Sequence, residues 1–89
     1  MAYEIFWSEV ARNSLRKLES DISQRILLKL RSVRESPHNF VERLSGKNFY
    51  KLRVGDYRVI LDIDEANKKI FIRLAGHRKN IYKILARAL

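Results

Sequence analysis

Hydrophobic and polar residues alternate along residues 50–64, YKLRVGDYRVILDID. Successive side chains of a strand point to opposite faces, so the alternation predicts two strands joined by a turn at Gly55-Asp56. One face is predicted to carry an apolar row: Tyr50, Leu52, Val54, Tyr57, Val59, Leu61 and Ile63. The other face receives the cations Lys51, Arg53 and Arg58. Because like charges on neighbouring strands repel, this face is expected to bind an anion.

The residues before this hairpin show one strand pattern and two helix patterns. Residues 3–7 are rich in aromatic and β-branched types and predict a first strand. Ser8 is the expected N-cap of a helix that begins at Glu9, and Asp21 is the expected cap of a second helix that runs to about Glu35. Pro37 ends this helix, and residues 37–48 are expected to form an irregular connection.

Alternation resumes after the hairpin, along residues 69–75. Ile70, Ile72 and Leu74 are predicted to point inward, with Phe71 and Arg73 pointing outward. Gly76 is expected to end the strand. The tail, residues 81–89, has apolar residues at helical spacing and predicts a short C-terminal helix.

This order of elements predicts an α+β fold in a single domain that spans residues 1–89. Strands joined by short turns pair antiparallel, so we expect an antiparallel sheet of about four strands. The two early helices should form an α-hairpin packed on one face, in the order β-α-α-β-β-β. The other face, with Lys51, Arg53, Arg58 and Arg73, is expected to stay open to a ligand.

The charge of the chain points to an acidic partner. Its 89 residues include 19 Lys and Arg against 10 Asp and Glu, a formal net charge of +9. Nucleic acid, an anionic membrane surface or an acidic protein would each compensate such a charge. The absence of cysteine and of a long apolar run excludes disulfides, a thiolate metal site and a membrane span. We therefore expect a cytoplasmic protein without membrane association, cofactor or metal.

The remaining chemistry favours RNA. The sequence has no glycine-rich phosphate loop and no zinc-ligand spacing. Asp62 and Asp64 could act as paired carboxylates, but ion pairing with nearby cations explains them better. Guanidinium groups hold phosphates and aromatic rings stack on bases, and RNA supplies its own 2′-hydroxyl nucleophile. From residue spacing alone, a basic surface that binds without catalysis is favoured over an enzyme.

Three stretches resemble the RelE/ParE superfamily of toxin–antitoxin toxins. The first is L-x-G-x-x-x-Y-K-L-R-x-G-D-Y-R-V-I, which begins at Leu44. The second is Gly76-His77-Arg78 with Tyr82 after it, and the third is the start MAY followed by apolar residues. The resemblance covers nearly the whole chain. It implies the RelE branch, whose members cleave mRNA in the ribosomal A site through metal-independent attack by the 2′-hydroxyl.

The resemblance also implies roles for individual residues. Lys51 would act on the 2′-hydroxyl, Arg58 and Arg78 would hold the scissile phosphate, and Tyr82 would stack on the nucleotide. Arg53 departs from the family, whose best-known member has lysine there. Arginine keeps its proton, so Arg53 suits a phosphate clamp better than a proton donor. His77 could instead serve as the acid, or it could only form a hydrogen bond at the strand end. The expected catalytic residues are thus Lys51, Arg53, Arg58, Arg78 and Tyr82, and the expected nucleic-acid contacts are Lys51, Arg53, Arg58, His77 and Arg78.

Partners follow from the same resemblance. It implies an acidic RelB-like antitoxin that wraps the toxin, the ribosome with its mRNA as target, and DNA contact only through the toxin–antitoxin complex. The tail helix could be an element that the antitoxin displaces, or ordinary core. The superfamily also contains ParE-like toxins that inhibit gyrase and lack nuclease activity. Four of the five catalytic positions are identical to the RelE set and the fifth is basic, which favours the ribonuclease branch.

Overall fold

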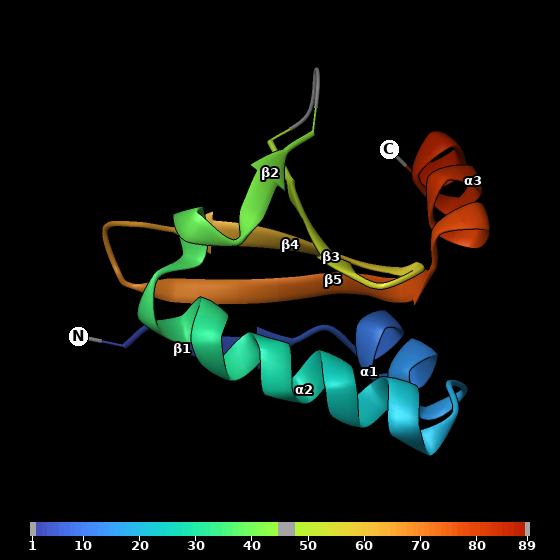
Figure 1. The fold of residues 1–89 in the computed structure, drawn as a ribbon. Coiled ribbons are helices and arrows are strands. Elements are labelled where there is room, and N and C mark those ends of the chain that lie inside the picture. Colours follow the sequence, from blue (N-terminus) through green and yellow to red (C-terminus); the bar gives the residue numbers. More distant parts are fainter. Residues whose placement is uncertain (1, 45–47, 89) are drawn as a thin grey trace.

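A five-stranded sheet is the centre of the fold, shown in Figure 1 as a computed structural model that describes residues 2–44 and 48–88. The strands lie in the order β1-β5-β4-β3-β2. β1 pairs parallel with β5, and the other neighbours pair antiparallel. The elements are β1 (Glu4–Trp7), α1 (Glu9–Arg16), α2 (Ser20–Glu35), the 3₁₀ helix η1 (Pro37–Asn39), β2 (Val41–Arg43), β3 (Tyr50–Val54), β4 (Tyr57–Asp64), β5 (Lys69–His77) and α3 (Arg78–Ala88).

The predicted α+β class and the C-terminal helix are confirmed, but the sheet has five strands rather than about four. The additional strand is β2, within the segment that was expected to be irregular. A strand of three residues is too short to show an alternation of hydrophobic and polar residues in the sequence. It is recognised in the structure by its pairing with residues 50–52 of β3. Ser45 and Gly46, which belong to the family-like segment, lie outside the described residues.

The main core lies between the sheet and the helices α1 and α2, which both lie below the sheet in Figure 1. The predicted alternation of the hairpin is confirmed here, because Leu52, Val59 and Leu61 are fully buried. Ile26 and Val33 of α2 pack against them. Burial of such side chains contributes about 1.5–3 kcal/mol each to the stability of the domain.

A β-bulge between β4 and β5 changes which side chains face this core. Leu61 pairs with Ile72 and Ile60 pairs with Leu74, so β5 has one more residue than β4 at this point. The extra residue turns Leu74 to the opposite face. Leu74 is therefore buried as predicted, but not on the same face as Ile70 and Ile72. Leu74 and Ile60 instead form a second, smaller core with Ile81 and Leu85 of α3.

Element boundaries follow the predicted signals in part. Ser8 caps α1, since its Oγ accepts a hydrogen bond from the N–H of Ala11 at 3.0 Å. Asp21 is not the cap of α2, because that helix begins at Ser20 and Asp21 lies in its first turn. Gly76 does not end β5, which continues to His77. None of the helices in the described ranges is long and apolar enough to cross a membrane.

Gly76 lies next to the first turn of α3. A Cβ atom at this position would lie 3.4 Å from Cδ1 of Ile81, in van der Waals contact with that side chain. Ile81 is almost fully buried in the smaller core. The first turn of α3 thus packs directly on the end of β5.

Candidate nucleic-acid interface

Three cations of the β3–β4 hairpin meet at one cavity, as the alternation predicted. Lys51, Arg53 and Arg58 line a cavity of about 130 Å³ together with Phe40 and Glu42. Arg53 and Arg58 are direct cross-strand partners. Their side chains therefore leave the sheet on the same face, which is opposite to the main core. Like charges on directly paired residues repel each other. An anion bound in the cavity would offset this repulsion.

Arg58 is not an open cation as expected. It is only 6% exposed, and its Nη1 donates hydrogen bonds to the carbonyl oxygens of Gly55 and Tyr57, both at 2.8 Å. These contacts brace the tight turn between β3 and β4, where Gly55 has a left-handed φ of 59°. Arg58 therefore has a structural role as well as being part of the lining of the cavity.

Glu42 was not found from the sequence. Its Oε2 lies 3.7 Å from Nζ of Lys51, across the pairing of β2 with β3. The sequence around it shows only an acidic residue between the apolar residues Val41 and Leu44, a pattern that does not predict a three-residue strand. The carboxylate compensates part of the positive charge of the cavity.

Two more of the predicted site residues come from α3. Lys51 Nζ lies 6.0 Å from the centroid of the Tyr82 ring, at the outer limit for a cation–π contact. Arg78 is exposed at the start of α3, where its N–H donates to the carbonyl oxygen of Asp56 at 2.9 Å. This bond joins the beginning of α3 to the β3–β4 turn. The sheet and α3 thus bring Tyr82 close to Lys51.

His77 lies on the other face of the sheet. It is the cross-strand partner of Tyr57, and the two rings meet edge to face at 5.3 Å between centroids. Tyr57 packs against the main core, so His77 points to the side of α1 and α2. Its Nδ1 accepts a hydrogen bond from the N–H of Lys79 at 3.2 Å. The structure therefore does not bring His77 together with the cations of the hairpin.

The carboxylates of β4 are engaged in local contacts. Asp62 forms an ion pair with Arg73 at 3.3 Å, as predicted. Asp64 accepts hydrogen bonds from the backbone and the side chain of Asn67, and these bonds lower the pKa of its carboxyl group. Both contacts lie within β4, β5 and the turn that joins them. Within the described ranges, no three His, Cys, Asp or Glu side chains gather where they could hold a metal ion.

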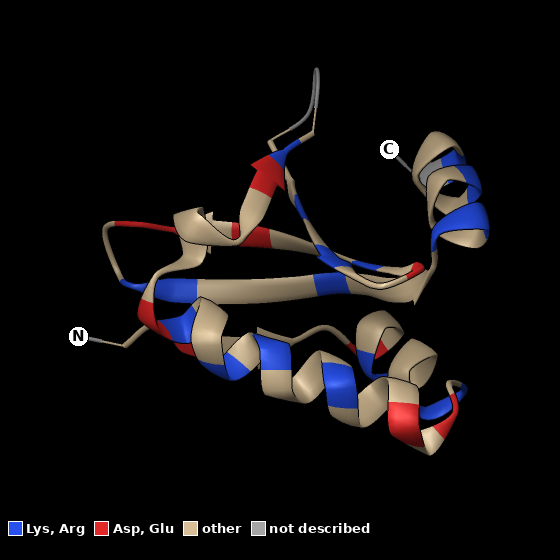
Figure 2. Cartoon of the chain, in the orientation of Figure 1, with Lys and Arg blue, Asp and Glu red and all other residues tan. Residues whose placement is uncertain are grey.

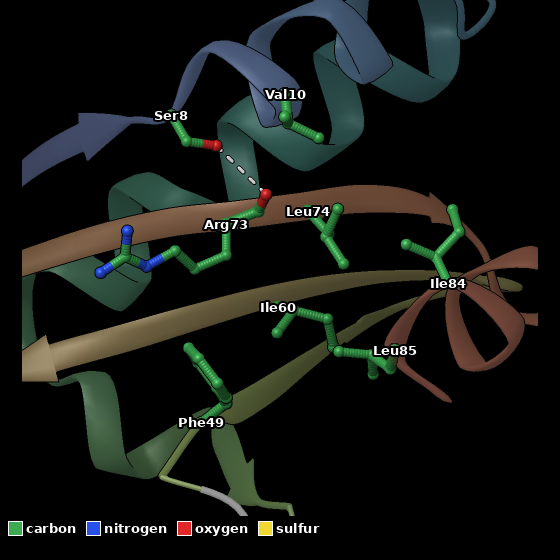
Figure 3. A pocket seen from close by; sticks show the side chains of 8 residues that line it. All are labelled: Ser8, Val10, Phe49, Ile60, Arg73, Leu74, Ile84 and Leu85. Atoms are coloured by element: carbon green, nitrogen blue, oxygen red, sulfur yellow. Dashed lines mark hydrogen bonds between the residues drawn. The ribbon is translucent and has the colours of Figure 1, made fainter. Parts of the chain in front are cut away.

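Figure 2 shows how the charges are distributed over the elements. Lys and Arg recur along α2, on β3 and in α3, whereas acidic residues gather at the ends of elements. A different surface lies between α3, the sheet and the start of α1, where side chains enclose a cavity of about 410 Å³ (Figure 3). Its lining is mainly apolar: Val10, Phe49, Ile60, Leu74, Ile84 and Leu85, with Ser8 and Arg73 as the polar members.

Comparison with known proteins gives the family of the chain. The family model described as the ParE toxin of type II toxin–antitoxin systems, parDE, matches residues 5–82. No curated protein matches the chain in sequence.

Solved structures of RelE toxins share the fold. The isolated RelE toxin of E. coli matches with a TM-score of 0.76 and 28% identity, over 99% of this chain and 100% of that one. The toxin in the archaeal RelE–RelB complex from Pyrococcus horikoshii matches with a TM-score of 0.74 and 27% identity, over 88% and 97% of the two chains. The RelBE2 complex from Mycobacterium tuberculosis matches with a TM-score of 0.79 over 88% and 100%, and at 22% identity it supports the fold alone. The family model covers most of the chain, and the structures agree with it; the chain belongs to the ParE toxin family of type II toxin–antitoxin systems, within the RelE/ParE superfamily.

Proposed function

We propose that this toxin is a ribosome-dependent endoribonuclease that cuts mRNA in the ribosomal A site. One observation carries the proposal: Lys51, Arg53 and Arg58 line a single cavity, with Tyr82 of α3 next to Lys51. Cations that converge on a small cavity suit a phosphodiester, and an aromatic ring beside them suits a base. The RelE toxins to which the chain is similar at 27–28% identity support the same branch.

The proposed reaction uses the hydroxyl group of the RNA itself. The 2′-oxygen attacks the neighbouring phosphorus atom, the bond from phosphorus to the 5′-oxygen breaks, and a 2′,3′-cyclic phosphate forms. Lys51 is the proposed general base, which takes the proton of the 2′-hydroxyl. Arg53, Arg58 and Arg78 stabilise the extra negative charge on the phosphorane oxygens. Tyr82 orients the nucleotide by stacking on its base.

The leaving 5′-oxygen must gain a proton. Arginine stays protonated in proteins, so Arg53 serves as a clamp for the phosphate rather than as the acid. His77 lies on the opposite face of the sheet beside Tyr57, and we therefore assign it no role in this step. Water protonates the leaving oxygen in this scheme. The reaction needs no metal ion because the three guanidinium groups neutralise the charge.

An acidic, RelB-like antitoxin is the proposed partner in the cytoplasm. Related toxins from E. coli and Pyrococcus horikoshii were solved in complexes with RelB. The net charge of +9 favours an acidic partner, and the apolar cavity beside α3 offers a place for the hydrophobic side chains of such a chain (Figure 3). Contact with operator DNA is proposed only for the toxin–antitoxin complex.

Primer extension on ribosome-bound mRNA tests the nuclease. The wild type should produce new 3′ ends at the A-site codon, and Lys51→Ala and Arg78→Ala should lower the cleavage rate by about 10²-fold or more. Arg12→Ala, at an exposed position of α1, is the matched control and should cut at the wild-type rate. Equal cleavage by Lys51→Ala and the wild type would overturn the assignment of the site.

The family match favours a second candidate function. The matching family model is that of ParE, and ParE-like toxins inhibit gyrase rather than cut RNA. In that case the purified protein should block supercoiling of a relaxed plasmid by gyrase and leave ribosome-bound mRNA intact. Binding of RNA without either effect would leave a non-catalytic basic RNA-binding domain as the function.

A further inference from the structure

A second basic cavity lies on the other side of Arg53. It has a volume of about 390 Å³ and lies between α2 and the β3–β4 turn. Arg53 lines this cavity as well as the cavity of Lys51 and Arg58, so the two are neighbours. Arg25 and Lys29 of α2 supply its other cations, and Leu28, Ser32, Val54 and Gly55 complete the lining.

Both α2 cations are held near the hairpin. The Arg25 guanidinium group lies over Gly55, with its Nη2 only 3.0 Å from the place where a Cβ atom would be. Lys29 Nζ lies 5.5 Å from the centroid of the Phe40 ring, and Phe40 in turn lines the first cavity. The two adjacent cavities are thus lined by five cations: Arg25, Lys29, Arg53, Arg58 and Lys51.

The edge of the sheet is open between the two cavities. β2 pairs with β3 only at residues 50–52, so Arg53 and Val54 lie beyond the end of β2. An extended polymer can therefore pass from the face of the sheet with Lys51 and Arg58, around the edge of β3, to α2. Within residues 2–44 and 48–88, no ion pair engages Arg25, Lys29 or Arg53, and no carboxylate lines the second cavity.

We propose that Arg25 and Lys29 bind backbone phosphates of the RNA strand next to the scissile nucleotide, so that the RNA follows a track from Lys51 to α2. This inference rests on the proposed function, since the strand begins at the proposed cleavage site. RNA suits the track better than an acidic protein because Arg53 lines both cavities. An RNA strand that is bound for cleavage in the first cavity would therefore reach the second cavity with its next nucleotides. Phe40 and Leu28 are 38% and 60% exposed beside the cations and offer apolar contacts to splayed bases.

The salt dependence of binding to free RNA tests the track. The probe is a fluorescein-labelled oligouridylate of about 12 nucleotides, with 2′-O-methyl riboses that prevent cleavage. Each phosphate contact with a single strand contributes about 0.7 to the slope of log Kd against log salt concentration, so Arg25→Gln with Lys29→Gln should lower this slope by about 1.4. The double variant Arg12→Gln with Arg16→Gln removes the same charge from α1 and should keep the wild-type slope.

A dinucleotide of the same chemistry, with a single phosphate between its two nucleosides, locates the effect. Its one phosphate is expected to bind in the first cavity, so its affinity should be equal for the wild type and the Arg25/Lys29 variant, while Arg53→Gln should weaken both probes. An unchanged slope with the long probe would overturn the proposal, as would an equal loss in both double variants. The proposal would also be overturned if the Arg25/Lys29 variant lost binding to polyglutamate while its salt dependence of RNA binding stayed unchanged. That result would assign the surface to an acidic protein.

The outcome is independent of the cleavage assay. The probe cannot be cut, so a wild type that fails in primer extension but shows the slope change refutes the nuclease and supports the track. A wild type that cuts mRNA but shows no slope change refutes only the track. Arg25 and Lys29 are exposed, and equal melting temperatures of the variants and the wild type will exclude unfolding as the cause.

Discussion

Arg58→Ala should destabilise the domain as well as inactivate the site. The residue is 6% exposed and donates two hydrogen bonds at 2.8 Å, to the carbonyl oxygens of Gly55 and Tyr57. Hydrogen bonds from charged donors contribute about 1.5–3 kcal/mol each. Relief of the repulsion between Arg58 and its partner Arg53 offsets part of this loss. We therefore expect the free energy of unfolding to fall by about 2–4 kcal/mol.

Urea denaturation followed by circular dichroism measures the loss. For a domain of this size, 1 kcal/mol corresponds to roughly 4–8 °C in Tm, so Tm should fall by about 10–30 °C. Arg58→Met keeps the aliphatic stem but not the donors, and it should lose nearly as much stability as the alanine variant. Arg78→Ala, at an exposed position, should change the free energy of unfolding by less than about 0.5 kcal/mol.

A free energy of unfolding for Arg58→Ala within about 0.5 kcal/mol of the wild type would refute the bracing role of the guanidinium group. The consequence for the cleavage assay is practical. Loss of activity in Arg58→Ala reports on chemistry only when the folded fraction is measured in the same preparation. Lys51 and Arg78, which make no comparable buried hydrogen bonds within the described residues, are the cleaner positions for testing catalysis.

Three further predictions concern stability. Ser8→Ala removes the cap that accepts from the N–H of Ala11 and should cost about 1 kcal/mol, read from urea titrations. Gly55→Ala places a Cβ atom at a φ of 59° and 3.0 Å from Arg25, so it should cost roughly 1–2 kcal/mol or more; no change in Tm would contradict this. Hydrogen bonds from Tyr3 and then His38 lower the pKa of Glu65, so its contribution to stability is present above pH 4.5 and is lost as the pH falls through the lowered value. Glu65→Gln should reduce this loss in acid, and an unchanged dependence of Tm on pH would contradict the assignment.

Local patterns were sufficient for most elements of the fold. The alternation of residues 50–64 predicted which side chains face the main core, because a strand sends neighbouring side chains to opposite faces. It did not predict the burial of Arg58 and Ile60 on the other face. The cap at Ser8 was found for a similar reason, since the bond reaches only three residues along the chain. The meeting of Lys51, Arg53 and Arg58 also follows from one short turn.

Features that depend on distant pairing could not be predicted. The bulge of β5 reversed the face of Leu74, and β2 formed only because β3 offered an edge. The same pairing placed Glu42 beside Lys51. A pattern read along one strand contains no information about the register with its neighbour, so such errors are expected in these positions.

The sequence by itself determined the alternation, the charge of +9 and the resemblance to one toxin superfamily. The tertiary structure decided which cations are available to an anion. Arg58 is buried by its contacts with the turn, His77 lies on the far face beside Tyr57, and Arg25 of α2 reaches the hairpin. The physical reason is that net charge and the alternation of residue types are set by the sequence. The burial of a side chain and the face of the sheet on which it lies depend on which elements pack together.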